Sequence, residues 1–92
     1  MKKVFTEQEE KIYTDRIFLD IFHEEGIDES ELEQAICQSY NTDENTYNKI
    51  SEIPMELKIE AITDTCELSG LAFEDYGDIL NYFFDKYNNL CI

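Results

Sequence analysis

Residues 74–87, EDYGDILNYFFDKY, carry the clearest structural signal in this sequence. Apolar side chains recur there at i, i+3, i+4, i+7, i+8 and i+11, which is the spacing of one face of an α-helix. These side chains are Tyr76, Ile79, Leu80, Phe83, Phe84 and Tyr87. Glu74, Asp78 and Asp85 fall on the opposite side, and Gly77 costs such a helix about 1 kcal/mol relative to alanine. We therefore expect an amphipathic helix whose aromatic stripe lies in the core.

Two further helices are expected upstream, and each has the spacing of a capping box at its start. Thr6 and Glu9 mark the start of the first helix, which is expected to run to a glycine stop at Gly26. Asp28 and Glu31 mark the start of the second helix. The apolar face of this second helix is expected to consist of Leu32, Ala35, Ile36 and Tyr40.

A third helix is expected to begin near Pro54, because proline suits the first turn of a helix, and to end near Gly70. The polar stretch 41–51 before it is expected to be a loop. The inner face of the third helix is predicted to consist of Met55, Ile59, Ile62 and Cys66.

These patterns predict a mostly α-helical fold, a compact single domain of about four helices over residues 1–92. An α+β fold with a small sheet is the alternative, with strands at 17–22 (IFLDIF) or 55–61 (MELKIEA). A short apolar run fits a buried strand or a helix equally well, and residues 55–61 also alternate with a period of two. The Glu, Leu, Lys and Ala content of residues 55–61 favours the helix.

Charge restricts the kinds of partner that this chain can have. Twenty-two acidic residues against seven basic ones give a net charge of −15. No Lys or Arg lies between Ile17 and Asn48, or between Ile59 and Asp85. Binding to nucleic acid or to an anionic membrane needs a basic patch, so we expect neither, and a basic protein is the expected partner. No apolar run is as long as a membrane span.

The start of the chain, MKKVFTEQEE, lacks the apolar region of a secretory signal. The cysteines, Cys37, Cys66 and Cys91, are odd in number and include no CxxC pair. This pattern argues against a disulfide framework or a zinc site and favours a reducing compartment. We therefore expect a cytoplasmic protein.

Residues 41–52, NTDENTYNKISE, have the ligand spacing of a calcium-binding EF-hand loop, with oxygen-bearing side chains at Asn41, Asp43, Asn45 and Glu52. Thr46, however, stands where such a loop needs a glycine for its sharp turn. Lys49 adds a positive charge at the ninth position. We therefore interpret this stretch as a polar loop and predict no metal site.

The sequence lacks the residue combinations that common catalytic mechanisms require. His23 is the only histidine, and the sequence has no serine-nucleophile motif to pair with it, so we expect no Ser–His or Cys–His arrangement with an orienting group. His23 is expected near a helix end, where its cation would favour the helix dipole. The chain has three glycines and no phosphate-binding loop. We predict that the protein is not an enzyme and needs no cofactor.

The acidic residues of the third helix form a pattern of their own. Glu56, Glu60, Asp64 and Glu67 are spaced i, i+4, i+8 and i+11, in a line away from the inner face. A domain of this length is about 30 Å across, and duplex DNA of that length carries about 18 phosphate charges. The net charge of −15 is of the same order. A DNA-mimicking surface is thus predicted at Asp20, Glu24, Glu25, Asp28, Glu31, Glu33, Glu56, Glu60, Asp64, Glu67, Glu74, Asp75 and Asp78.

The acid-rich segments IDESELEQ (27–34), NTDENTY (41–47) and AFEDYGD (72–78), in so short a chain, resemble the small acidic DNA-mimic anti-restriction proteins of bacteriophages, the Arn type. The resemblance covers the whole chain by size and charge, without a diagnostic motif. It implies a homodimer that looks like duplex DNA in the host bacterial cytoplasm. It also implies that the target is a host restriction enzyme, the modified-cytosine-dependent McrBC.

Two alternatives stay open for the partner and its mode of binding. The basic host protein can be a restriction enzyme or a nucleoid-type protein. The chain can also be an immunity-type inhibitor or adaptor that binds a basic partner outside its DNA-binding surface. For the homodimer, the candidate contacts are the apolar segments 17–22 and 90–92.

Overall fold

The computed structural model describes residues 3–90, with side chains through Tyr87. This part of the chain forms α1 (Glu7–Ile21), α2 (Glu29–Tyr40), the short 3₁₀ helix η1 (Ile50–Glu52), α3 (Met55–Leu68) and α4 (Tyr76–Leu90). Residues 3–90 contain no β-strand. The prediction of a mostly helical fold with four helices is therefore confirmed. Segments 17–22 and 55–61, the strands of the alternative sheet, are helical or at a helix end.

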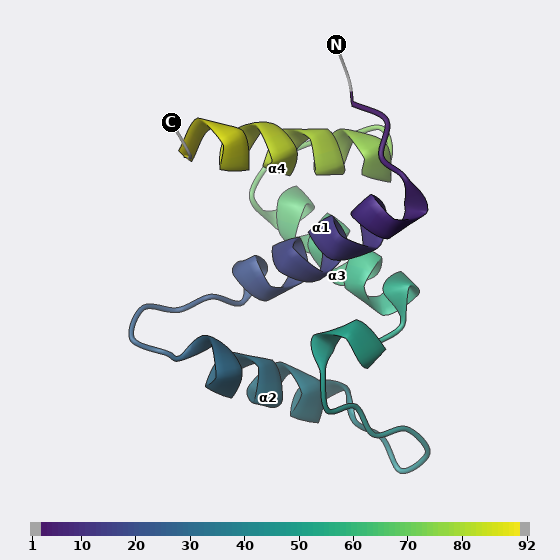
Figure 1. Cartoon of the computed structure of the whole chain (residues 1–92), viewed down its shortest axis with the longest axis vertical. Coiled ribbons are helices and arrows are strands. Elements are labelled where there is room, and N and C mark those ends of the chain that lie inside the picture. The colour runs from purple at the N-terminus through teal and green to yellow at the C-terminus, as the bar shows by residue number, and fades with distance from the viewer. Residues whose placement is uncertain (1–2, 91–92) are drawn as a thin grey trace.

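Helices α1 and α3 cross at the centre of the molecule and share its most extensive helix contact. Helix α4 packs on both of them at one end, and α2 lies at the other end (Figure 1). Helix α2 is attached to the rest of the fold largely through η1, which contacts both α1 and α2. The molecule is elongated as a result, with principal extents of 43 × 29 × 27 Å.

Every helix contributes buried apolar side chains to the core. Its buried apolar side chains are Ile17, Phe18, Leu32, Ile36, Cys37, Ile50, Ile53, Ile62, Cys66, Ile79 and Leu80. The prediction that the stripe of α4 packs into the core is confirmed, with Ile79 and Leu80 buried and its aromatic rings half-buried around them. In α2, the predicted inner residue Ala35 is exposed, and Cys37 is buried in its place. The buried face of α2 is therefore slightly rotated from the predicted one, and this helix packs mainly on η1.

The predicted helix starts are correct in position, but only one has its capping box. At α1, the Thr6 hydroxyl accepts a hydrogen bond from the Glu9 amide at 3.2 Å, and the Glu9 carboxylate accepts one from the Thr6 amide at 3.2 Å. Asp28 stands at the N-cap of α2, yet its side chain makes no capping hydrogen bond. The sequence spacing therefore located both helix starts, although the capping box predicted for α2 is wrong.

Helix α1 ends at Ile21, five residues before the predicted stop at Gly26. The last turn of α1 has no basic residue, and Glu24 and Glu25 follow it. Negative charge is unfavourable at the carboxyl end of a helix dipole, which explains the early end. Gly26 has a φ of +86° and serves the turn of the following loop instead.

The only base of α3, Lys58, lies inside the protein. Its side chain has no exposed surface. The Lys58 ammonium forms an ion pair with Asp15 of α1 and donates a hydrogen bond to the Ile50 carbonyl of η1 at 3.2 Å. A buried cation needs such partners, since an unpaired charge in the core is very costly. Lys58 thus joins α1, α3 and η1.

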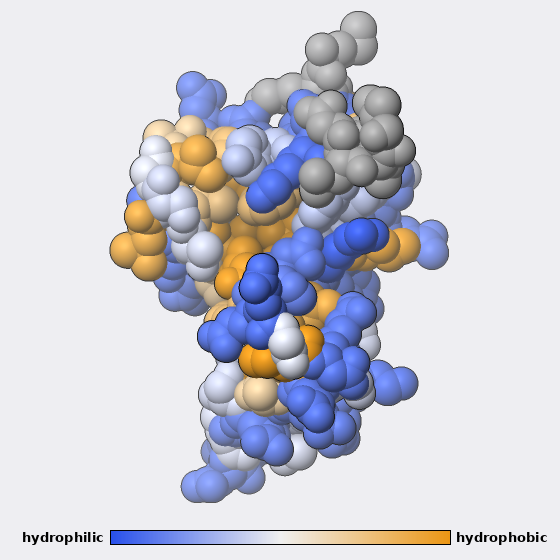
Figure 2. Space-filling model, turned by 90° about the vertical axis from the view of Figure 1, so that its left-hand side faces the viewer, coloured by the Kyte–Doolittle hydropathy of each residue, from blue (hydrophilic) through white to orange (hydrophobic). Residues whose placement is uncertain are grey.

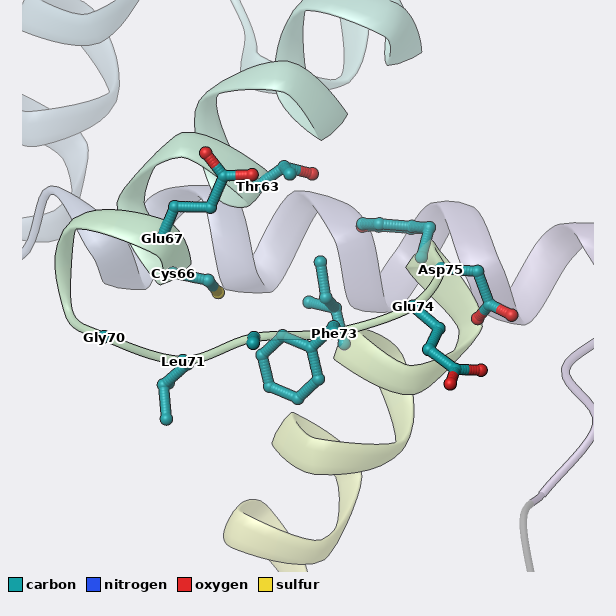
Figure 3. A pocket seen from close by; sticks show the side chains of 11 residues that line it. Thr63, Cys66, Glu67, Gly70, Leu71, Phe73, Glu74 and Asp75 are labelled. Atoms are coloured by element: carbon teal, nitrogen blue, oxygen red, sulfur yellow. The ribbon is translucent and has the colours of Figure 1, made fainter.

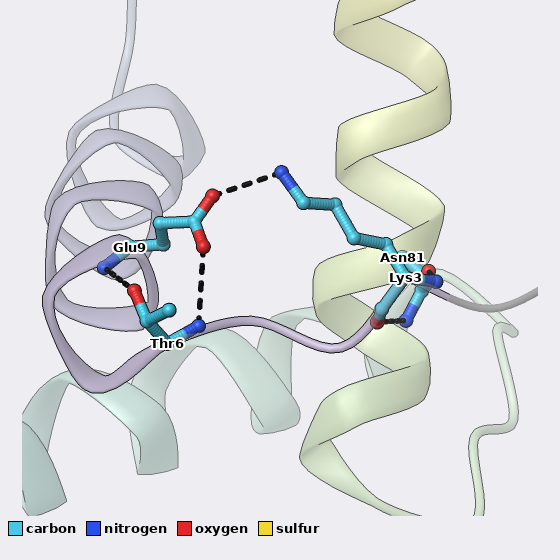
Figure 4. A network of polar contacts seen from close by, with 4 residues as sticks. All are labelled: Lys3, Thr6, Glu9 and Asn81. Carbon is cyan, nitrogen blue, oxygen red and sulfur yellow. Dashed lines mark hydrogen bonds and ion pairs between the residues drawn. The ribbon is translucent and has the colours of Figure 1, made fainter.

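Polar contacts also hold residues 3–6 against α4 (Figure 4). The Lys3 amide donates to the Asn81 side-chain oxygen at 2.8 Å, and the Asn81 side chain donates back to the Lys3 carbonyl at 3.2 Å. The Lys3 ammonium pairs with Glu9 at 2.9 Å and lies 4.8 Å from the centre of the Phe84 ring. Glu9 in turn closes the capping box with Thr6, so one carboxylate fixes both the segment and the helix start.

Within residues 3–90, none of the helices combines the length and the apolar character that crossing a bilayer requires.

Candidate site: the acidic row of α3 and the adjoining pocket

The outer face of α3 carries a continuous row of carboxylates. Glu56, Glu60, Asp64 and Glu67 are all exposed, as their spacing predicted. On an α-helix these four positions fall within an arc of about 80° and span about 16 Å. We call this set the acidic row. Since Lys58 is buried on the opposite side of the helix, α3 contributes no cation to neutralise it.

A pocket adjoins the carboxyl end of the acidic row. Helix α3 ends in a Schellman motif, in which the Leu71 amide donates to the Cys66 carbonyl at 2.9 Å and the Gly70 amide to the Glu67 carbonyl at 3.0 Å. Gly70 has the positive φ of +82° that this motif requires. The chain then turns back past the end of α3 and enters α4, and the turn encloses a pocket of about 410 Å³.

The pocket has apolar walls and acidic ends. Its apolar lining comes from Cys66, Leu71, Ala72, Phe73, Tyr76 and Ile79. Glu67 lies at one end of the pocket, and Glu74 and Asp75 lie at the other (Figure 3). None of the residues that line it is basic. Six residues of the predicted acidic surface therefore lie in the acidic row or line this pocket: Glu56, Glu60, Asp64, Glu67, Glu74 and Asp75.

Asp75 also has a structural role at the start of α4. Its carboxylate accepts a hydrogen bond from the Asp78 amide at 3.0 Å, which is the bond of an N-cap residue. A side chain at Gly77 would bring its Cβ to 3.1 Å from this carboxylate, so the glycine leaves space for the cap. Asp78, predicted on the acidic surface, is half-buried rather than fully exposed.

The remaining predicted acids lie at the α1–α2 end of the molecule. Asp20, Glu24, Glu25, Asp28 and Glu31 are exposed, and Glu33 is half-buried. Two of them are engaged in the fold, because Asp20 accepts a hydrogen bond from the Tyr87 hydroxyl and Glu33 accepts one from the Ile50 amide at 3.3 Å. Burial, followed by this contact with Asp20, raises the pKa of Tyr87.

Basic residues accompany the acids at this end. Asp20 and Glu33 line a cavity of about 630 Å³ together with Arg16, His23 and Lys49. The structure therefore divides the predicted acidic surface into two parts. In the part on α3 and the α3–α4 turn, every charged residue that lines the pocket is acidic. In the part near α2, acidic and basic residues line the same cavity.

The loop with EF-hand spacing uses its polar side chains internally. Asn41 accepts a hydrogen bond from the Tyr47 amide at 2.6 Å, and Glu52 accepts one from the Asn48 amide at 3.1 Å. Residues 50–52 form η1 rather than the start of a long helix. Among the residues that the structure describes, no cluster of three or more His, Cys, Asp or Glu side chains is arranged to hold a metal ion.

The cysteines within the described region are free and buried at Cys37 and Cys66, and burial raises the pKa of both thiols. Protonated, enclosed thiols are poor nucleophiles. Sequence reasoning missed the pocket beside Cys66. Its signal was the apolar group Leu71, Ala72 and Phe73 in a segment that belongs to no helix.

The candidate dimer contacts differ in availability. Ile17 and Phe18 are completely buried within the monomer, so most of segment 17–22 is ordinary core, and Phe22 is its most exposed apolar residue at 39%. Of segment 90–92, residues 91 and 92 and the Leu90 side chain lie outside the described part. Figure 2 shows one face on which apolar surface gathers in the half that contains α4, while the other half is mostly hydrophilic.

Comparison of this chain with protein-family models, curated proteins and solved structures finds no match.

Proposed function

We propose that this protein is a DNA-mimic inhibitor. It occupies the DNA-binding surface of a basic host protein, most directly a restriction endonuclease such as McrBC, and thereby protects phage DNA. The observation that carries the proposal is the acidic row, a line of exposed carboxylates on one rigid helix that continues to the acidic ends of the pocket.

Helical placement gives these carboxylates the properties of a phosphate row. Successive members of the acidic row are about 5 to 6 Å apart along the helix axis. Lysine and arginine side chains that bind phosphate also bind carboxylates, and arginine does so through two hydrogen bonds at once. Because the helix already holds the carboxylates in place, binding loses less conformational entropy than it would with a flexible acidic tail.

The observed dimensions sharpen the comparison with DNA. Duplex DNA as long as the 43 Å axis of the molecule carries about 25 phosphate charges, against the protein's net charge of −15. The monomer is thus less densely charged than DNA. The difference in charge density is larger than the one expected from a domain about 30 Å across. A side-by-side homodimer, which we include in the proposal, would double the charge presented. Sedimentation that finds only monomer at micromolar concentration would contradict the dimer.

A competition experiment with two charge-matched variants tests the proposal. The test variant neutralises the acidic row with Glu56→Gln, Glu60→Gln, Asp64→Asn and Glu67→Gln. The control variant neutralises the same number of exposed acids outside α3, on α1, the loop 41–49 and α4, with Glu7→Gln, Asp43→Asn, Glu44→Gln and Asp85→Asn. Both variants lose four negative charges. McrBC cleavage of modified DNA, and DNA binding by a nucleoid-type protein, are measured with each.

We expect the wild-type protein and the control to block one of these activities at low salt, and the test variant to be about tenfold weaker or worse. Inhibition should fall steeply as salt rises, since it depends on charge. Equal loss in both variants would show that total charge matters and the acidic row does not. A ternary complex in which the target still binds DNA would instead support the immunity-type mode of binding.

A further inference from the structure

We infer that the pocket between α3 and α4 receives an apolar side chain that projects from the basic surface of the partner. This inference rests on the proposed function and specifies the chemistry of the target. A target that contacts DNA only through its phosphates would bind the acidic row without any further contact. The apolar pocket beside the row indicates a second, uncharged contact.

The pocket has the size and lining of a binding site rather than of a packing defect. Its volume of about 410 Å³ is within the range of pockets that hold small ligands. Its lining includes the half-buried side chains of Leu71, Phe73 and Tyr76 and the buried side chain of Ile79. These groups keep apolar surface exposed to water in the free protein, so an apolar occupant gains by covering it.

Charge decides what kind of occupant fits. Glu67 stands at one end of the pocket and Glu74 and Asp75 at the other, without a basic residue in the lining (Figure 3). An apolar side chain flanked by lysine or arginine would place its cations against these carboxylates. An apolar side chain flanked by acids would be repelled.

DNA-binding proteins of one class present this combination of groups. Proteins that kink DNA insert apolar wedges between base steps from a surface that is otherwise basic. A mimic of DNA for such a protein needs an acidic surface for the basic groups and an opening for the wedge. The acidic row and the pocket supply these two elements side by side, so the geometry favours a target with an apolar wedge within its DNA-binding surface.

Two synthetic peptides test the inference on the full chain. One has the sequence KKKFKKK, and the other has alanine in place of the central phenylalanine. Their affinities for the protein are measured by calorimetry at low and high salt. We expect the phenylalanine peptide to bind about tenfold more tightly, since part of its ring is buried. Both affinities should fall with salt, while their ratio persists because the apolar contact is not screened.

A pocket-filling variant and a matched control locate the contact. Ala72 is exposed and lines the pocket, so Ala72→Phe should fill it without disturbing the core. Ala35 is an exposed alanine of α2, at the opposite end of the molecule from α4, and Ala35→Phe is the control. We expect the affinity ratio of the peptides to fall to about one in Ala72→Phe and to remain in Ala35→Phe. Chemical shifts of Thr63 and Ala72 on titration provide an independent readout.

The outcomes separate this inference from the proposed function. A ratio of one in the wild-type protein, or an unchanged ratio in Ala72→Phe, would overturn the inference. The variant with the neutralised acidic row should bind both peptides more weakly at an unchanged ratio. If the ratio behaves as expected but no DNA-binding protein is inhibited, the pocket binds basic apolar segments and the proposed function fails by itself.

Discussion

The two faces of α3 differ in the sign and the exposure of the charge that they carry. On the inner face, Lys58 is completely buried and paired with Asp15. On the outer face, the acidic row is exposed without a basic residue from its own helix. One of the seven bases in a chain with a net charge of −15 is therefore in the core, where it cannot offset the surface acids.

This difference follows from helix geometry. Lys58 is two residues from Glu56 and from Glu60, and residues two apart do not share a helix face, so this lysine does not stand beside the acidic row. The fold therefore contains both a desolvated cation and a row of carboxylates that repel one another. The first is compensated by Asp15 and the Ile50 carbonyl, and the second remains at the surface.

The largest effect is expected from breaking the inner pair. In Asp15→Ala, the buried Lys58 ammonium keeps only the Ile50 carbonyl as a partner. Because removing one partner leaves an uncompensated buried charge, we expect a loss of about 3 kcal/mol in the free energy of unfolding. Urea denaturation of the variant and the wild type measures this loss.

Replacing the cation itself is the control for that prediction. Lys58→Met keeps most of the side-chain volume without the charge, so the double variant Asp15→Ala/Lys58→Met should recover much of the lost stability. A double variant no more stable than Asp15→Ala would mean that Asp15 acts on the fold through something other than Lys58.

A smaller effect of opposite sign is expected on the outer face. Glu60→Gln removes the repulsion of Glu60 with Glu56 and with Asp64, each four residues away. We expect a gain of about 0.5 kcal/mol at low salt that disappears near 1 M salt. Asp43→Asn, an equal charge change in the exposed loop 41–49, is the control and should gain less. Thermal unfolding at both salt concentrations distinguishes local repulsion from a general effect of net charge.

The smallest effect is expected at the partly exposed ion pair of Lys3 and Glu9, which contrasts with the buried pair of Lys58 and Asp15. The hydrogen bond from Lys3, and next that from the Thr6 amide, lower the pKa of Glu9 from its ordinary value of 4.5. A lowered pKa in the folded state means that the stabilising contribution is complete above pH 4.5 and is lost as the pH falls through the folded-state pKa. We expect the contacts of Asn81 with Lys3 to loosen in that acidic range.

Nuclear magnetic resonance titration of the Asn81 side-chain amide measures this loosening. Glu9→Gln should remove the acidic step, because the glutamine amide carries no charge to titrate. A step that persists in Glu9→Gln would assign the transition to another carboxylate.

Local patterns predicted the elements well, but not the contacts between them. The aromatic stripe of α4 and the capping box at Thr6 depend on neighbours within one or two helical turns, and both are present. The end of α1 and the inner face of α2 were placed wrongly, at Gly26 and Ala35. The inner face of α2 depends on how this helix meets the rest of the fold, which no local spacing encodes. The end of α1 was misplaced because the glycine at position 26 was weighed above the acidic residues that precede it.

The candidate site shows the same division. Helical spacing predicted the acidic row of α3, because residues four apart share one face of any helix. The pocket beside it was missed, since it forms only where the turn after Gly70 brings Leu71 and Phe73 against the start of α4. The separation of uniformly acidic and mixed surfaces was also missed. Arg16 lies four residues before Asp20 on α1, which helical spacing could have shown, but Lys49 lines the same cavity as Asp20 and Glu33 only in the folded chain.

The sequence by itself determined the helices, the net charge of −15 and the line of carboxylates on one helix face. Only the tertiary structure decided that Lys58 is buried against Asp15 and that an apolar pocket opens next to the acidic row. The physical reason is range: helix periodicity and capping act between residues a few positions apart, whereas burial and charge pairing depend on which distant elements the packed core brings together.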